Sequence, residues 1–209
     1  MASLIERVPL DAFLPYVMIG APTCPESVAQ AFVLDTCTDF CTRSNTLRRR
    51  VRIIPQAGVH DYPIWPDHDE QIVRVNEVRT REARYIGARD VDDFACIGRR
   101  FTIRDGELHV NGHVGEWDDE HDTHIDVKFT AAPTTDACRV DATLLHDWRP
   151  AIVDGTLSRL YGLPGYPFSA PQLSVLRDRT YAAAINRARA RSLKSDTGDL
   201  IMATGVPFI

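Results

Sequence analysis

The fold is decided by residues 169–194, which read SAPQLSVLRDRTYAAAINRARARSLK. Ser169, Pro171 and Gln172 are typical of a helix start, because a serine hydroxyl can accept from a backbone N–H three residues on and proline fits the first turn. Apolar residues then recur at the helical repeat, at Leu173, Leu176, Tyr181, Ala184, Ile185 and Ala188. The stretch predicts a helix of about 25 residues, long enough to be the spine of its domain.

The other face of this predicted helix is basic. Asp178 is the only acid on it, and the bases are Arg177, Arg179, Arg187, Arg189, Arg191 and Lys194. The whole chain carries a net charge of −5, so the basic character is local and argues against a protein that coats nucleic acid. We favour a protein–protein contact, with solvent and phosphate as alternatives. The candidate subunit-interface residues are Arg177, Arg179, Arg187 and Arg191.

The composition is that of an ordinary globular protein. The 209 residues are 44% hydrophobic and 25% charged, and the five cysteines lack the paired close spacing of zinc ligands. Reduced thiols and a cytoplasmic setting are the natural interpretation. The uncharged apolar run 12–22 is too short to cross a bilayer, and Glu6 and Asp11 before it fit a signal peptide poorly. We therefore expect no membrane partner.

Two further helices and a strand-rich segment complete the predicted fold. A Thr23 cap, Pro25 and Glu26 predict a helix to about Ser44, and a third apolar stripe covers 152–161. Between them the chain alternates as strands do, with a hairpin signal at Asp105-Gly106 and a half-exposed strand at 125–130. The predicted class is α+β: a helical bundle from both chain ends with an inserted antiparallel β module. The expected domains are a helical core (1–48 and 141–194), the β module (49–140) and a C-terminal docking tail (195–209).

The C-terminal tail is apolar and pliable. Its large side chains would lose burial energy if left in water. Folding back onto the chain's own helices is one interpretation. We favour docking onto a neighbouring subunit or another protein, followed by ordering on binding. The docking residues would be Leu200, Ile201, Met202, Val206, Phe208 and Ile209.

One acidic segment could carry chemistry. Residues 116–124 hold five carboxylates with His121 and His124, a set that could bind a metal. Since the segment lies between two predicted strands and no spacing supplies a third ligand, a solvated loop is the simpler interpretation, and 67–70 is interpreted in the same way. No glycine-rich phosphate loop follows a strand, and no GxSxG motif occurs. We expect no catalytic residue, no cofactor and no metal.

An ordered set of segments resembles the phage head-to-tail adaptor (connector) proteins. The similarity is specific near residues 13–44 and 150–191 and weak through the β module. It rests on Phe13-Leu14-Pro15-Tyr16-Val17, Ala21-Pro22, Asp39-Phe40-Cys41-Thr42-Arg43-Ser44, Ile152-Val153-Asp154-Gly155-Thr156-Leu157, Leu160-Tyr161, Pro167-Phe168-Ser169-Ala170-Pro171 and Phe208-Ile209.

This resemblance implies a structural virion protein without catalytic activity. Members of the family form a homo-oligomeric ring, of twelve copies where it matches the portal, that joins the portal protein to a tail protein (nozzle or hub). DNA passes through the channel without sequence-specific binding. The expected location is the virion neck or tail, after assembly in the host cytoplasm. Two alternatives stay open: a neck or tail-completion protein of a long-tailed phage, and a metal-dependent enzyme using the His121/His124 acidic cluster.

Overall fold

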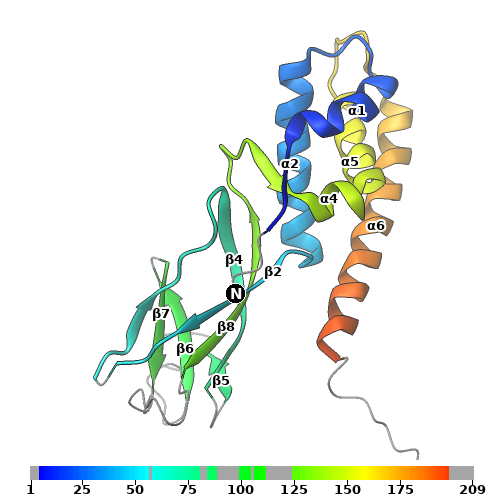
Figure 1. Cartoon of the computed structure of the whole chain (residues 1–209). Coiled ribbons are helices and arrows are strands. Elements are labelled where there is room, and N and C mark those ends of the chain that lie inside the picture. The colour runs from blue at the N-terminus through cyan, green and yellow to red at the C-terminus, as the bar shows by residue number, and fades with distance from the viewer. Residues whose placement is uncertain are drawn as a thin grey trace, which may run out of the picture. The chain divides into compact units, whose positions relative to one another are not determined.

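The computed structural model describes residues 5–56, 58–80, 84–88, 99–104, 106–111 and 124–197 (Figure 1). The chain divides into two compact units. The first contains residues 1–46 and 140–209, and the second contains residues 47–139. None of the described helices combines the length and the hydropathy needed to span a bilayer.

Three helices form the main part of the first unit: α2 (Glu26–Ser44), α5 (Arg149–Tyr161) and α6 (Pro171–Thr197). Helix α5 packs against both α2 and α6, and α2 and α6 also contact each other directly. The buried side chains where they meet include Phe40, Ile152, Leu160, Tyr181 and Ile185. All three helices were predicted from apolar periodicity. The predicted Thr23 cap is wrong, because α2 begins after Pro25 and no side chain caps it.

Shorter elements complete the first unit. Strand β1 (Arg7–Pro9) leads into η1 (Leu10–Phe13) and α1 (Leu14–Gly20), and β9 (Arg139–Asp141) leads into α4 (Ala142–His146). Strands β1 and β9 pair in a two-stranded sheet. The Asp141 carboxylate caps α4 by accepting from the Thr143 backbone N–H at 2.8 Å.

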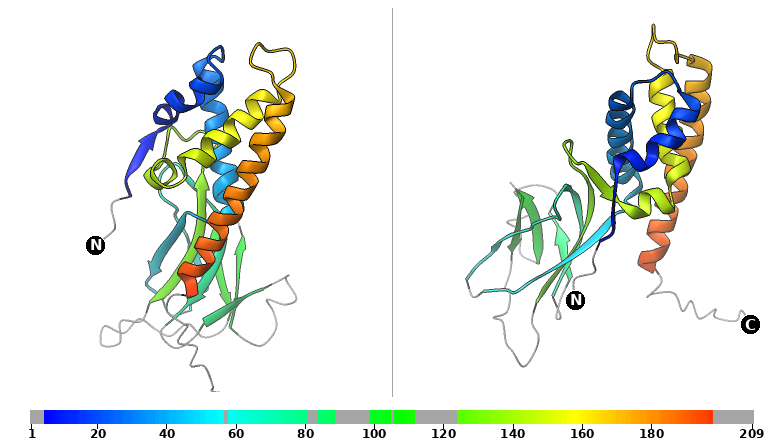
Figure 2. Two further views of the ribbon diagram at one scale, coloured as in Figure 1. Left: turned by 90° about the vertical axis from the view of Figure 1, so that its right-hand side faces the viewer. Right: turned by 45° about the horizontal axis from the view of Figure 1, so that its top comes forward.

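The second unit is a seven-stranded sheet with the order β2-β8-β4-β5-β6-β7-β3, which curls in Figure 2. The pairs are antiparallel except for β5 and β6, which run parallel. The predicted Asp105-Gly106 hairpin is confirmed as the β6–β7 pair, and Gly106 has the positive φ (82°) that such a turn requires. The strands are β2 (Arg48–Ile53), β3 (Asp61–Pro63), β4 (Glu70–Arg79), β5 (Arg84–Gly87), β6 (Arg100–Arg104), β7 (Glu107–Asn111) and β8 (Ile125–Pro133).

Strand β8 is more buried than its alternating sequence predicts. Both of its edges are paired, with β2 on one side and β4 on the other. Ile125, Val127 and Phe129 are buried on one face, but Asp126 and Thr130 on the other face are buried too. The predicted half-exposed strand is therefore wrong, because side chains from the two flanking strands cover its polar face.

The predicted fold class, a helical bundle from both chain ends with an inserted antiparallel β module, is also wrong. The molecule is sheet-rich: its large sheet is mixed rather than antiparallel, and a second sheet joins β1 to β9. The chain ends therefore build a helix-and-strand unit, not a bundle. Three-residue strands such as β1 and β9 are too short to show a period of two, and local alternation carries no information about parallel pairing across distant segments.

Candidate interaction surfaces

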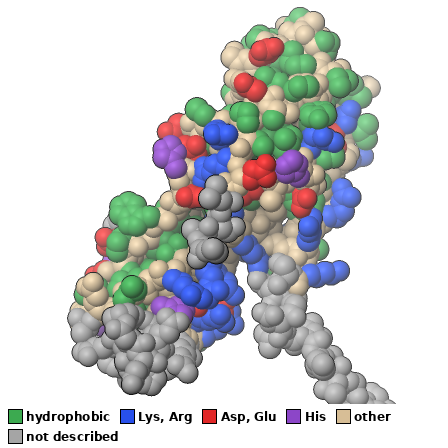
Figure 3. Space-filling model, in the orientation of Figure 1, with side chains coloured by type: hydrophobic (Ala, Val, Ile, Leu, Met, Phe, Trp, Pro, Cys, Tyr) green, Lys and Arg blue, Asp and Glu red, His purple; other side chains and the backbone are tan. Residues whose placement is uncertain are grey.

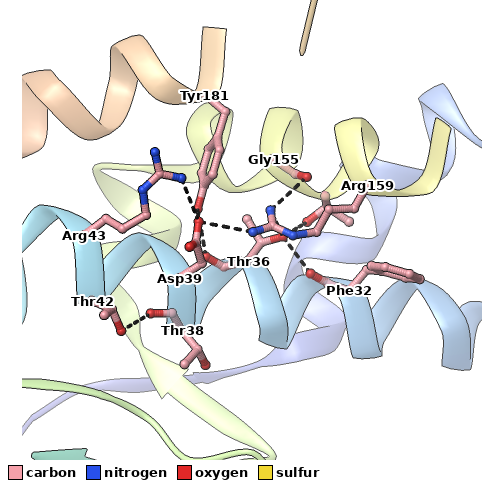
Figure 4. Close-up of polar contacts among 10 residues, drawn as sticks. Phe32, Thr36, Thr38, Asp39, Thr42, Arg43, Gly155, Arg159 and Tyr181 are labelled. Carbon is pink, nitrogen blue, oxygen red and sulfur yellow. Dashed lines mark hydrogen bonds and ion pairs between the residues drawn. The ribbon is translucent and has the colours of Figure 1, made fainter. Parts of the chain in front are cut away.

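A polar joint holds the three long helices in place (Figure 4). The Asp39 carboxylate of α2 accepts from the Tyr181 hydroxyl of α6 at 2.8 Å and pairs with the Arg159 guanidinium of α5 at 3.1 Å. Arg159 also donates to the Thr36 hydroxyl at 3.1 Å and to the Gly155 carbonyl oxygen at 3.2 Å. Burial, and then the charge of Asp39, raise the pKa of Tyr181, so its hydroxyl stays a neutral donor. This joint fixes which faces of α2 and α6 remain outside.

Two of the four arginines proposed for a subunit interface are engaged within the first unit. Arg177 pairs with Asp154 of α5. The Arg191 guanidinium lies 3.0 Å from the Asp147 carboxylate, with its carbon 5.9 Å from the centre of the Trp148 ring. These contacts tie α6 to its own unit, so Arg177 and Arg191 are poorly placed to supply free charge to a partner.

The other two arginines lie on the solvent side of α6. Arg179 and Arg187 are exposed, as is Arg189, and none has an ion pair within the ranges that the structure describes. We call Arg179, Arg187 and Arg189 the basic face of α6. On α2, Glu26 and Asp35 are likewise exposed and make no ion pair with described residues. Only Asp35 lies on the outer side of α2, which we call the acidic face of α2, because Glu26, nine residues or two and a half turns earlier, points to the opposite side of the helix.

Large apolar side chains are exposed at one end of the first unit. They come from α1, from the turn before α6 and from the first turns of α6, and Ile19 is 82% exposed. Hydrophobic side chains gather over this end in Figure 3. We call this set the apolar patch; its members are Tyr16, Ile19, Tyr166, Leu173, Val175 and Leu176.

Leu173 and Leu176 were expected in the buried stripe of the spine helix, and that expectation is wrong. The face of α6 that meets α5 instead continues from Tyr181 back to Ser174. The Ser174 hydroxyl donates to the Ser158 carbonyl oxygen at 2.8 Å, and the Ser158 hydroxyl donates to the Ser174 carbonyl oxygen at 3.1 Å. Because Ser158 and Ser174 occupy the contact between α5 and α6, Leu173 and Leu176 lie on the outer side of α6.

The second unit holds a cluster that sequence reasoning missed. The buried Asp126 carboxylate on β8 accepts two hydrogen bonds from Arg50 of β2, at 2.8 and 2.7 Å. The Arg52 guanidinium (3.5 Å), Arg79 (3.7 Å) and the His124 ring (3.2 Å) surround the same carboxylate. Burial acts to raise the pKa of Asp126, but the bonds and charge of Arg50, with His124, outweigh it and lower the pKa. The sequence pattern that could have indicated this cluster is the alternation of Arg48, Arg50 and Arg52 along β2.

The remaining predicted sites lie largely outside the described residues. Of the acidic cluster only His124 is described, since His121 and the rest of 116–123 fall outside. No group of three or more histidines, cysteines or carboxylates placed to hold a metal occurs in the part of the chain that is described. At 67–70, the His68 ring lies 2.7 Å from the Asp69 carboxylate. The six tail residues proposed for docking, between 200 and 209, are also outside the described ranges.

Comparisons with known proteins give no family for this chain. No model of a known protein family matches the sequence, and no curated protein matches it.

Proposed function

We propose that the protein is a phage head-to-tail adaptor, a structural component that forms a ring between the portal and the tail around the DNA channel. It acts by binding other subunits and not by catalysis. The observation that carries this proposal is a single unit that exposes three kinds of contact surface: the basic face of α6, the acidic face of α2 and the apolar patch. The ordered similarity of residues 13–44 and 150–191 to the adaptor family supports it.

The charged faces suit a ring because they differ from each other. A ring requires a heterologous interface, in which one patch of each subunit meets a different patch of the next. The basic face of α6 and the acidic face of α2 are of opposite sign and lie on the outer sides of two helices of the same unit. In the proposed ring the α6 of one subunit lies against the α2 of its neighbour, and the charges set the register.

The apolar patch would supply affinity in the same assembly. A large apolar side chain contributes roughly 1.5–3 kcal/mol when it goes from full exposure to full burial, and the patch members are already partly covered. Even a fraction of that gain from six side chains exceeds what exposed charge pairs supply, at about 0–1 kcal/mol each. Contiguous apolar patches on soluble proteins commonly mark interaction sites. We assign this patch to the portal, which leaves the charged faces for neighbouring subunits.

The proposal keeps three further features from the family resemblance. Twelve copies would match the portal's symmetry, a tail protein would bind the opposite side, and residues 195–209 would dock onto the portal or a neighbour. The protein would be found in the virion neck after assembly in the host cytoplasm.

Negative-stain electron microscopy of the full chain mixed with its portal protein tests the proposal. We expect added ring density on one end of the portal particle. Portal particles that look the same with and without the protein, at concentrations well above the micromolar range, would contradict it.

A further inference from the structure

On one side of β2, β8 and β4, the stretch of sheet around residues 126–130 of β8 is almost entirely charged. The register places three side chains from each of β2, β8 and β4 on it, with Arg52 and Arg79 both opposite Asp126, and Arg50 and Glu77 both opposite Lys128. Six of the nine are basic and two are acidic. We call this the basic sheet face; its members are Arg48, Arg50, Arg52, Arg74, Glu77, Arg79, Asp126, Lys128 and Thr130.

The two carboxylates organise the cations but do not neutralise them. The Asp126 side chain is only 8% exposed beneath the arginines, whereas those of Arg52 and Arg79 are 60% and 46% exposed. Glu77 is similarly enclosed and pairs with Lys128 at 2.9 Å. The acids are therefore largely buried and the excess positive charge points to solvent. Lys and Arg side chains gather over this part of the sheet in Figure 3.

Like charges sit close together within the face. Arg48 and Arg74 both lie opposite Thr130, on either side of β8. Burial, and then the charge of Arg74, lower the pKa of Arg48. An anion that lies across the three strands would meet the exposed arginines of β2 and β4 together.

We propose that the basic sheet face binds the phosphate backbone of a nucleic acid. Arginine presents a planar set of donors that matches phosphate oxygens. Alternate residues on a strand recur about every 6.6–6.8 Å, so β2 places three arginines in a row, of which Arg50 and Arg52 are exposed to an extended polyanion. Phosphate contacts of this kind position a nucleic acid without reading its sequence.

The composition of the face favours nucleic acid over an acidic protein. Protein–protein interfaces have an apolar core within a polar rim. None of the nine side chains is apolar, so a protein partner would find no dry centre there. None is aromatic either, so bases would have no surface on which to stack. Backbone binding in either duplex or single strands is what such a face can provide.

This inference does not depend on ring formation, and its test uses the dilute full-length chain. Fluorescence anisotropy would follow binding to a labelled random-sequence 20-base-pair DNA duplex between 50 and 200 mM potassium chloride. The informative variant is Arg52→Gln/Arg79→Gln, because Arg50 remains to hold Asp126. We expect the double variant to bind about tenfold or more weakly, with the slope of log affinity against log salt reduced by about two.

The control variant also removes two positive charges, but from residues outside the basic sheet face. Arg99→Gln/Arg104→Gln changes two exposed arginines at β6, outside the basic sheet face, and should leave the affinity and the salt slope unchanged. The proposal is wrong if wild type shows no salt-dependent binding, if the control loses as much as the sheet variant, or if the sheet variant binds like wild type. It is also wrong if polyglutamate of equal charge displaces the DNA as well as unlabelled DNA does, since that result indicates an acidic protein partner.

A single substitution can replace the double variant if the double variant misfolds. If the double variant loses the circular dichroism of the wild type, Arg52→Gln alone replaces it, with an expected slope change of about one. Ring assembly is scored separately with the portal, so a failure of DNA binding leaves the adaptor proposal standing, and the reverse also holds.

Discussion

Gly155 lies where α5 approaches the other two helices with no room for a methyl group. A Cβ at this position would stand 2.7 Å from Cγ2 of Thr36 and 2.8 Å from Cδ2 of Tyr181. Alanine would otherwise favour the helix, by up to about 1 kcal/mol. We expect Gly155→Ala to lower the free energy of unfolding by roughly 1–3 kcal/mol, because the core cannot accept the added atom without shifting. Thermal unfolding followed by helical circular dichroism measures this.

Gly162 supplies the matched control at the end of the same helix. A Cβ there would meet its nearest neighbour, the Ser174 hydroxyl oxygen, at 3.4 Å, which is ordinary contact. Gly162→Ala should change the unfolding midpoint little. If both substitutions are neutral, the close packing around Gly155 that we describe is incorrect.

Asp126 gives the second unit a defined response to acid. Its pKa is lowered in the folded protein, so its ion pairs stabilise the fold fully above the ordinary carboxylate pKa of about 3.9 and are lost as the pH falls through the lower folded value. Asp126→Asn removes this contribution. We expect it to reduce stability by about 1–3 kcal/mol at pH 7 and by clearly less at pH 3. The infrared amide band of the strands, followed through thermal unfolding, reports on this unit.

Glu107→Gln is the control for that experiment, because it removes an exposed carboxylate from β7 of the same sheet. Its effect should be small at both pH values. A stability loss in Asp126→Asn that is equal at pH 3 and pH 7 would contradict the assigned ion pairs.

At the scale of elements, a helix or strand could be predicted from the sequence where its apolar residues recur with a clear period. Helix α6 was predicted as 169–194 and runs over Pro171–Thr197, because its apolar repeat and its proline start are both local features. The burial of Leu173 was mispredicted, since the side of α6 that faces α5 runs through Ser174, which exchanges hydrogen bonds with Ser158. Asp126 was assigned to solvent because the arginines that cover it come from strands whose register the sequence does not show.

Charge reversal on α2 and α6 tests how neighbouring subunits meet. We expect Arg179→Glu alone, or Asp35→Lys alone, to weaken assembly strongly, because each places like charges across every interface. A chain with both changes should assemble again, since it restores opposite charge. Analytical ultracentrifugation of each variant with the portal compares them.

The informative outcome is recovery in the double variant. Loss of assembly in every variant, with folding intact by circular dichroism, would show that these faces do not contact each other. Arg177→Gln is excluded from this series because its pairing with Asp154 makes it a stability variant.

At the scale of the whole molecule, the pairing of strands that are distant in the sequence could not be predicted. The sheet between β1 and β9 joins residues about 130 positions apart, and the parallel β5–β6 pair breaks the antiparallel pattern that hairpin signals suggest. The adaptor proposal rests on ordered sequence segments in both halves of the chain. The surfaces that could serve an adaptor became visible only once the helices were packed.

Deleting residues 196–209 tests the proposed docking tail. We expect the truncated chain to remain folded and soluble but to fail to join the portal, because the apolar tail residues would be missing from the contact. Size-exclusion chromatography with the portal measures this. Normal assembly would show the tail to be dispensable, and unfolding in isolation would place it in the chain's own core.

Native mass spectrometry of the full chain with its portal tests the adaptor proposal most directly. The account predicts a closed complex whose mass corresponds to a ring of this protein, of twelve copies, bound to the portal. A lasting monomer beside unmodified portal in the same mixture would contradict it.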